Sequence, residues 1–154
     1  MIRTHGEYEI DDSRERIDFA MVHAWLSAAY WSQGETRDMI ERAAHGSSLL
    51  VGAYAGGEQV GYLRVVSDRV TFAWLSDVYV ADAHRRRGLA RAMVGFAVEH
   101  SEFQGMRRWL LATRDAHGVY APLGFAGLTK PQSMMEFRPN GVPPAPAPGT
   151  PGER

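Results

Sequence analysis

The sequence of 154 residues contains no cysteine, which excludes disulfides, thiolate catalysis and zinc sites built on cysteine. The six histidines show no HExxH-like spacing, so we expect no metal site. No segment approaches the roughly 20 apolar residues that span a bilayer, and the first residues lack the apolar run of a secretion signal. We therefore expect a cytoplasmic protein without a membrane partner.

An excess of positive charge is also missing, because the formal net charge is −1. This balance argues against a surface that coats nucleic acid, so we expect no nucleic-acid partner. Length and an apolar content of 45% fit one domain with a substantial core. Six of the eight prolines lie from Pro139 onward, where large apolar side chains are rare. We predict a domain over residues 1–138 and a disordered tail over 139–154.

The first half of the domain predicts a short strand followed by two helices. Residues 8–10 favour a strand, and Asp12 with Glu15 resembles a capping signal for a helix that runs to about Trp31. A second helix is predicted over 36–45, followed by Gly46 in the left-handed position that ends many helices.

The second half alternates strands and helices. The expected strands are rich in branched and aromatic residues, and glycine-containing or polar turns at 55–58 and 67–69 separate the first three. A strand, helix, strand order after residue 71 implies parallel pairing around a right-handed crossover. Helices on both faces of a mixed sheet, an α/β (α+β) fold, are the expected architecture. The strands are predicted at 48–54, 59–66, 71–80, 108–113 and 133–138, and the helices at 88–100 and 116–121.

An arginine-rich turn stands between the strand ending at Val80 and the helix that follows. It reads Arg85-Arg86-Arg87-Gly88-Leu89-Ala90. The first turn of a helix presents unpaired N–H groups and the positive end of the helix dipole, and glycine lets a ligand approach the backbone closely. The sequence therefore predicts a site for a multiply charged anion.

This turn resembles the (Arg/Gln)-x-x-Gly-x-(Gly/Ala) signature of the GNAT superfamily of acetyl-CoA-dependent N-acetyltransferases. Downstream, the segment from Ala116 to Phe125 (AHGVYAPLGF) is similar to the family's Ala-x-x-x-Tyr-x-x-x-Gly-Phe run. The two motifs stand in the expected order and structural context. The resemblance covers nearly the whole chain apart from the tail and implies an N-acetyltransferase.

The resemblance implies a mostly antiparallel sheet of six to seven strands that splays between its fourth and fifth strands, here 71–80 and 107–113. The pantetheine arm of acetyl-CoA would lie in the opening against the backbone, and N–H groups of the arginine turn would hold the pyrophosphate. Thr113 stands where many members have asparagine, and His117 contacts the cofactor or is a surface residue. The implied cofactor-binding residues are Val78, Val80, Arg85, Arg86, Arg87, Gly88, Leu89, Ala90, Thr113 and His117.

Two residues are candidates for acid-base chemistry. An alkylamine with a pKa near 10 is about one part in a thousand nucleophilic at neutral pH, so its proton must be removed. Asp77 is placed to act as that base, or only to attract a cationic substrate. Tyr120 matches the tyrosine that protonates the departing thiolate in this family; the alternative is a core tyrosine.

The acceptor is expected to contact the first two helices and the turns over the sheet opening. Trp25 and Trp109 are assigned to the core instead. Arg64 interrupts an apolar strand, so it faces solvent, a carboxylate partner or an anionic part of the acceptor. The candidate acceptor-binding residues are Tyr30, Trp31, Gln33, Arg37, Arg64 and Trp74.

Several functions remain open at this point. The leading hypothesis is acetylation of a small-molecule primary amine. A protein lysine or N-terminal acetyltransferase and a non-catalytic acyl-CoA-binding sensor are the alternatives, and the resemblance also allows a homodimer. A dinucleotide-binding domain and a P-loop NTPase are disfavoured, because the turn lacks the full G-x-G-x-x-G and no Gly-Lys-(Ser/Thr) follows Gly88.

Overall fold

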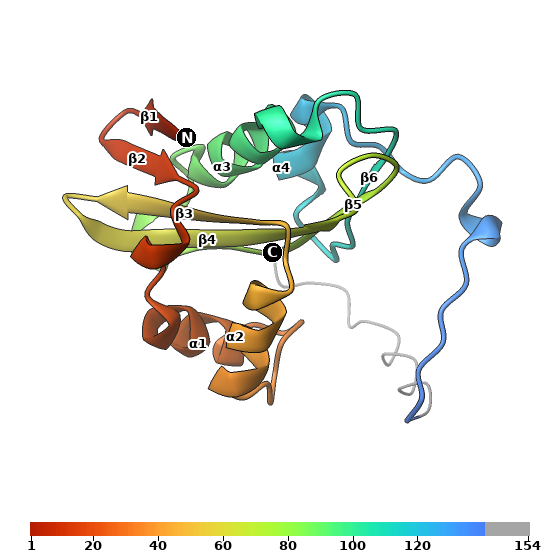
Figure 1. Cartoon of the computed structure of the whole chain (residues 1–154), viewed down its shortest axis with the longest axis horizontal. Helices are drawn as coiled ribbons and strands as arrows, with labels where there is room; N and C mark the ends of the chain where they lie inside the picture. Colours follow the sequence, from red (N-terminus) through yellow and green to blue (C-terminus); the bar gives the residue numbers. More distant parts are fainter. Residues whose placement is uncertain (141–154) are drawn as a thin grey trace, which may run out of the picture.

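A computed structural model describes residues 1–140, which contain one six-stranded sheet with its strands in sequence order (Figure 1). Neighbouring strands are antiparallel except for the last pair, β5 and β6, which is parallel. The predicted strand–helix–strand unit is therefore confirmed. All but the first two residues of the predicted tail lie outside the described residues. The strands are β1 (Ile2–His5), β2 (Tyr8–Asp11), β3 (Leu49–Ala55), β4 (Glu58–Ser67), β5 (Ala73–Val80) and β6 (Trp109–Leu110).

Helices cover both faces of the sheet, as expected. In Figure 1, α1 (Phe19–Ala28) and α2 (Arg37–His45) lie on one face, and α3 (Leu89–Val98) and α4 (His117–Tyr120) lie on the other. Each face has its own core, because the strands alternate their side chains between two layers. The α3 side buries Met93 and Phe96 against the sheet, and the α1–α2 side buries Tyr62.

The first helix begins later and ends earlier than the sequence predicted. Asp18, and not Asp12, caps it, since the Asp18 carboxylate accepts hydrogen bonds from the N–H groups of Ala20 and Met21. Asp12 is instead bound to the N-terminal ammonium group and, at 2.9 Å, to His100. The prediction of a helix over 12–31 was therefore wrong at both ends, and a short 3₁₀ turn, Arg14–Arg16, precedes α1.

Two other local predictions also need correction. The predicted first strand is the second half of a hairpin, because β1 pairs with β2 from Ile2↔Asp11 to His5↔Tyr8. Gly46 follows α2 with φ −78°, a right-handed conformation, and not in the expected left-handed one. Its N–H reaches back to carbonyls of the last turn, so the helix ends without a left-handed residue.

The sheet ends earlier than predicted at its C-terminal side. Of the strand expected over 108–113, only Trp109 and Leu110 pair with β5. The prediction of a strand over 133–138 is wrong. A 3₁₀ turn, Pro131–Ser133, precedes an exposed segment in which Phe137 is 86% exposed. Because β6 is so short, it offers little ladder for a further strand to join.

The parallel pair diverges after two residue pairs, and this divergence creates the site. Pairing stops at Trp74↔Leu110, so the rest of β5 separates from the chain that follows β6. On its other edge β5 carries a bulge, where Asp77 and Val78 together face Leu63 of β4 and Asp77 has φ +55°. A bulge re-aims side chains and frees backbone groups from the ladder.

Among residues 1–140, no helix has the length and apolar character required to cross a membrane.

Candidate active site

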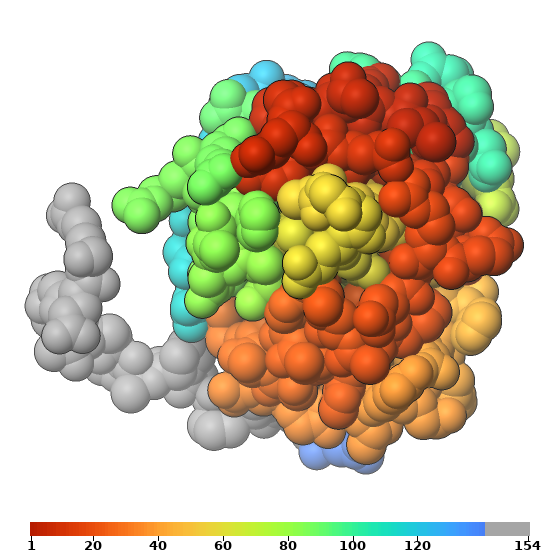
Figure 2. Space-filling view, turned by 90° about the vertical axis from the view of Figure 1, so that its left-hand side faces the viewer, coloured from red at the N-terminus to blue at the C-terminus, as the bar shows by residue number. Residues whose placement is uncertain are grey.

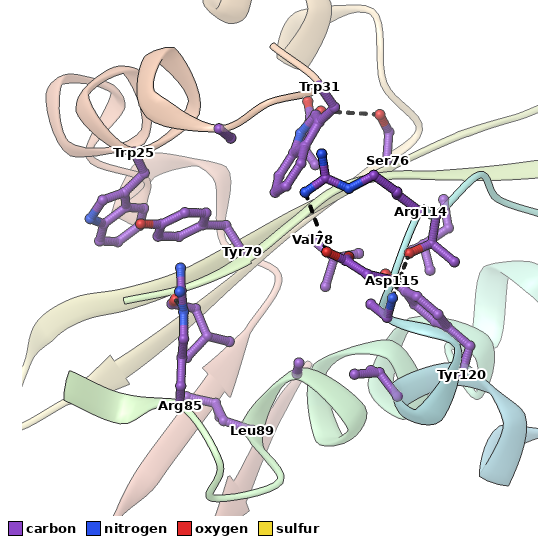
Figure 3. A pocket seen from close by; sticks show the side chains of 18 of the residues that line it. Trp25, Trp31, Ser76, Val78, Tyr79, Arg85, Leu89, Arg114, Asp115 and Tyr120 are labelled. Carbon is purple, nitrogen blue, oxygen red and sulfur yellow. Dashed lines mark hydrogen bonds and ion pairs between the residues drawn. The ribbon is translucent and has the colours of Figure 1, made fainter. Parts of the chain in front are cut away.

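A cavity of about 1120 Å³ occupies the opening between β5 and the chain after β6 (Figure 3). One wall is β5 from Trp74 to Val80, and the opposite wall is the segment from Ala112 to Tyr120. The start of α3 closes one end, and the end of α1 with the loop after it closes the other. The cavity therefore has an end built on the arginine turn and an end built on aromatic side chains.

The arginine turn has the backbone shape of an anion site. Arg86 and Gly88 both have positive φ, +61° and +76°, on either side of Arg87, and Gly88 is the N-cap of α3. Alternating conformations of this kind direct successive N–H groups to one side, toward the helix N-terminus. Figure 2 shows the segment before α3, in green, at the surface beside the yellow β3–β4 turn.

The three arginine side chains of the turn have different partners. The Arg85 guanidinium donates to the Val80 carbonyl at 2.9 Å, pairs with Asp82 at 2.9 Å and lies 5.3 Å from the centroid of the Tyr79 ring. Arg87 pairs with Glu7 at 2.6 Å, away from the cavity. Arg86 is exposed and lines the cavity without an ion-pair partner among the described residues.

Most of the expected cofactor-binding residues do meet at this cavity. The exceptions are Arg87, whose side chain pairs with Glu7, and His117, which is exposed on α4 and does not line the cavity. The Thr113 hydroxyl accepts the N–H of Ala116 at 3.0 Å, so it shapes the turn into α4. The expected residues that line the cavity are Val78, Val80, Arg85, Arg86, Gly88, Leu89, Ala90 and Thr113.

Aromatic side chains also line the cavity. Trp25 of α1 stacks on Tyr79 of β5 beside the Arg85 guanidinium, with ring centroids 5.2 Å apart and an angle of 16° between the planes. At the other end, Tyr30 and Trp31 meet edge to face at 5.0 Å, and each is 43% exposed. Such faces suit a cation or a flat apolar group.

Asp77 and Arg64 form an ion pair on the wall of this aromatic end. The Arg64 Nε donates to the Asp77 carboxylate at 2.5 Å, and the side chains are only 19% and 11% exposed. The second carboxylate oxygen accepts from the Ser76 hydroxyl at 3.2 Å. Of the three roles considered for Arg64, the structure shows the carboxylate partner.

Tyr120 lies on the opposite wall, 9% exposed, with its ring edge to face with Phe125 at 6.0 Å. Burial, and after it the neighbouring Tyr30, raise the pKa of Tyr120 above its ordinary value. The Tyr120 hydroxyl therefore holds its proton at neutral pH, which is the state that an acid needs.

A contact joins the loop after α1 to the wall formed by the segment after β6. The Tyr30 hydroxyl accepts a hydrogen bond from the backbone N–H of Arg114 at 3.2 Å, and the Arg114 guanidinium lies 3.8 Å from the centroid of the Tyr30 ring. Arg114 also pairs with Asp115 at 3.4 Å, as Figure 3 shows. The end of α1 thus touches the loop that precedes Tyr120.

The expected acceptor-binding residues are only partly brought together. Tyr30, Trp31, Arg64 and Trp74 line the cavity. Arg37 does not, because it pairs with Glu41 along α2 at 2.6 Å, and Gln33 is likewise outside the lining.

Sequence reasoning missed some lining residues and misassigned one. Trp25 was assigned to the core, whereas it packs on the α1–α2 core and also faces the cavity. Arg114 and Asp115 directly precede the second family motif, and that position was the only signal that could have found them. Trp109 packs against the core, edge to face with Phe103, as expected.

Comparison with known proteins identifies the family. The model of the Acetyltransferase (GNAT) family matches residues 10–125. The chain belongs to the GNAT family. A Gibberella zeae protein described as an acetyltransferase is 39% identical in an alignment of 135 residues, and the match covers 73% of this chain and 75% of that protein. The thialysine N-epsilon-acetyltransferase of Caenorhabditis elegans is 23% identical in an alignment of 142 residues, and the match covers 90% of this chain and 88% of that protein.

A solved GNAT structure confirms the fold. An acetyltransferase of this family from Xanthomonas campestris superposes with a TM-score of 0.81 at 38% identity, covering 85% of this chain and 92% of that one. The mostly antiparallel open sheet and the acetyltransferase class predicted from the sequence are therefore confirmed.

The cavity fits the acetyl-CoA that GNAT enzymes use. The edge of β5 past Trp74 is unpaired with β6 and suits an extended arm, and the N-terminus of α3 with Arg85 and Arg86 suits a diphosphate. A Cβ at Gly88 would lie 3.4 Å from the His5 ring, an ordinary contact, so the positive φ of +76° is what favours glycine here.

Proposed function

We propose that this GNAT enzyme transfers an acetyl group from acetyl-CoA to a primary amine of a small molecule. The observation that carries the proposal is a single cavity that runs from an anion-binding helix start to an aromatic end, with Asp77 on one wall and Tyr120 on the other. Acetyl-CoA supplies the acetyl group as a thioester, and the products are an amide and the CoA thiol.

The turn before α3 holds the diphosphate of the co-substrate in this proposal. Backbone N–H groups from Arg86 to Ala90 provide several charge-assisted hydrogen bonds, each worth roughly 1.5–3 kcal/mol. The edge of β5 that faces the opening carries Val78 and Val80. Past Trp74 it is unpaired with β6, so its backbone is available to an extended ligand.

Asp77 and Tyr120 perform the proton transfers. Asp77 binds the acceptor ammonium and receives its proton, directly or through water, which makes the amine nucleophilic. The amine nitrogen forms the new bond to the acetyl carbon while the carbon–sulfur bond breaks. Tyr120 then gives its proton to the departing thiolate.

A small acceptor is favoured because the aromatic end is bridged. The Tyr30–Arg114 contact connects the segment after α1 to the chain after β6, beside the cavity that Asp77 also lines. An extended polypeptide would need that contact to open. The relative whose name specifies thialysine as acceptor agrees with a small amine.

The test is calorimetric titration of the purified protein with acetyl-CoA, followed by thiol release against small primary amines and against peptides that carry the same amines. We expect acetyl-CoA to bind and thiol release to occur with a subset of the small amines and not with the peptides.

Other outcomes would contradict the proposal in different ways. Thiol release with peptides alone would favour a protein acetyltransferase. Binding of acetyl-CoA without release for any amine would favour an acyl-CoA sensor. Absence of binding would remove the assignment of the arginine turn.

A further inference from the structure

The Arg64–Asp77 pair is unusual for a site that has only to receive an amine. A carboxylate alone would be enough to bind a simple ammonium group. Here the Asp77 carboxylate on the cavity wall is paired with the Arg64 guanidinium at 2.5 Å. Ion pairs this far removed from water contribute little net stability compared with apolar packing, because both charges lose hydration. A role in ligand binding would explain why the two charges are kept on the cavity wall.

The guanidinium still has donors to offer. Arg64 Nη2 donates to the Ser76 hydroxyl at 3.2 Å and Nη1 to the Ser47 hydroxyl at 3.4 Å, besides the Nε bond to Asp77. Two of its five N–H groups therefore have no partner among the described residues. Arginine recognises carboxylates through parallel N–H groups of this kind.

The spacing of the pair restricts the ligand. Because the Arg64 guanidinium and the Asp77 carboxylate lie side by side, they match a ligand that carries a carboxylate and an ammonium group side by side. The carboxylate would face Arg64, and the ammonium would face Asp77. In an α-amino acid a single carbon separates the ammonium from the carboxylate. An amino acid with its amine at the far end of the chain must fold to bring both charges to a pair in direct contact, and that folding costs conformational entropy.

The rest of the aromatic end has room for a side chain. Trp31 and Trp74 line it. These faces are suited to a flat or apolar group.

We propose, on the basis of the proposed function above, that the acceptor is an α-amino acid with an aromatic or apolar side chain. Its carboxylate binds Arg64, and its α-ammonium binds Asp77 and becomes the acetylated amine. Arg64 is thereby the residue that distinguishes an amino acid from the corresponding simple amine.

The test compares matched ligands on the protein saturated with CoA. Calorimetry measures the dissociation constants of L-phenylalanine and of phenethylamine, which differ by the carboxylate alone, and of 2-aminobutanoate and 4-aminobutanoate, which differ in charge spacing. We expect phenylalanine to bind roughly 10- to 100-fold more tightly than phenethylamine, and 2-aminobutanoate more tightly than 4-aminobutanoate, from one or two charge-assisted hydrogen bonds.

Variants separate recognition from structural support. Arg64→Gln is expected to remove the preference for phenylalanine over phenethylamine, and Arg64→Lys to restore part of it, with the acetyl-CoA dissociation constant unchanged. A pair that only supported the β4–β5 bulge would change the affinity for both ligands alike. Arg42→Lys, at an exposed pair on α2, is the matched control and should keep the wild-type preference.

The outcomes distinguish this inference from the proposed function. Equal affinity for the matched ligands, or binding of neither, would overturn the inference even if simple amines release thiol. Preferred binding of phenylalanine supports the inference. If phenylalanine bound preferentially but no amine released thiol from acetyl-CoA, the proposed acetyl transfer would be wrong. The inferred class of ligand would still be supported.

Discussion

Single residues of the site show which part of the chemistry the sequence could predict. Tyr120 and Asp77 were both located by their position relative to motifs, and both line the cavity. Their roles stay predictions. The ion pair of Asp77 with Arg64 could not be predicted, because the two residues are neighbours only through the register of β4 and β5 at a bulge.

At this scale the first prediction concerns Tyr120→Phe. Removing the hydroxyl should lower turnover roughly 100-fold, the low end for an acid-base group since a thiolate leaves readily, with the acetyl-CoA dissociation constant unchanged. Thiol-release kinetics and calorimetry measure the two quantities. Tyr54→Phe, a buried tyrosine on β3 outside the cavity lining, is the matched control and should turn over normally. Equal turnover in the two variants would rule out Tyr120 as the acid.

The sequence predicts the ends of helices and the positions of turns correctly where a local signal determines them. The helix α2 begins after Thr36, whose hydroxyl accepts the N–H of Met39, and the turn at Gly56 and Gly57 has the positive φ that only glycine adopts freely. The helix α1 was misplaced because Asp12, with Glu15 three residues later, carries a local capping signal that Asp18 lacks. Only tertiary contacts, such as that of Asp12 with His100, distinguish them.

The turn before α3 provides a prediction for an element. Gly88→Asp should weaken acetyl-CoA binding at least tenfold, because a carboxylate at the helix start repels the diphosphate. Aspartate tolerates positive φ better than most residues, and Gly105→Asp is a matched control with the same φ of +76° and open space around it. Calorimetry with acetyl-CoA measures both variants. A loss of affinity shared by the control would point to strain instead of the phosphate site.

The whole molecule buries several tyrosine hydroxyls. Burial raises the pKa of Tyr54 to about 12 and raises the pKa of Tyr62 and Tyr120 above the ordinary value of 10. The hydroxyls of Tyr54 and Tyr62 have no hydrogen-bond partner among the described residues, so only their neutral forms suit the core. The folded protein therefore holds these protons more tightly than the unfolded chain does.

The pH dependence of stability follows from that difference. A group with a raised folded-state pKa stabilises the fold fully below its unfolded pKa and loses this contribution as pH rises through the folded value. We expect the contribution of these tyrosines to the free energy of unfolding to be level up to about pH 10 and to fall between pH 10 and 12. Urea denaturation across this range measures it. The free energy of unfolding of the Tyr62→Phe variant should fall less steeply with pH than that of the wild type. Identical slopes would contradict this role of Tyr62.

The architecture as a whole was predictable, but the inner surface of the cavity was not. Periodicity predicted the strands and helices, and the family resemblance carried by the two motifs implied the opening. The joining of α1 to the loop before α4 through Tyr30 and Arg114 depends on residues 84 positions apart in the chain. The strand predicted over 133–138 failed for a related reason, since strand-forming composition does not supply a neighbouring strand.

Because the sheet opens between β5 and the chain after β6, a ligand bound in the cavity also affects the free energy of unfolding. Two residue pairs of β5 and β6 and the contact of Tyr30 with Arg114 join the cavity walls directly. A bound molecule that touches both walls adds contacts that the unfolded chain cannot make. At a free concentration 100 times its dissociation constant, such a ligand would add about 2.7 kcal/mol to the free energy of unfolding. With acetyl-CoA bound as proposed, the stability of this enzyme therefore depends on the concentration of that co-substrate.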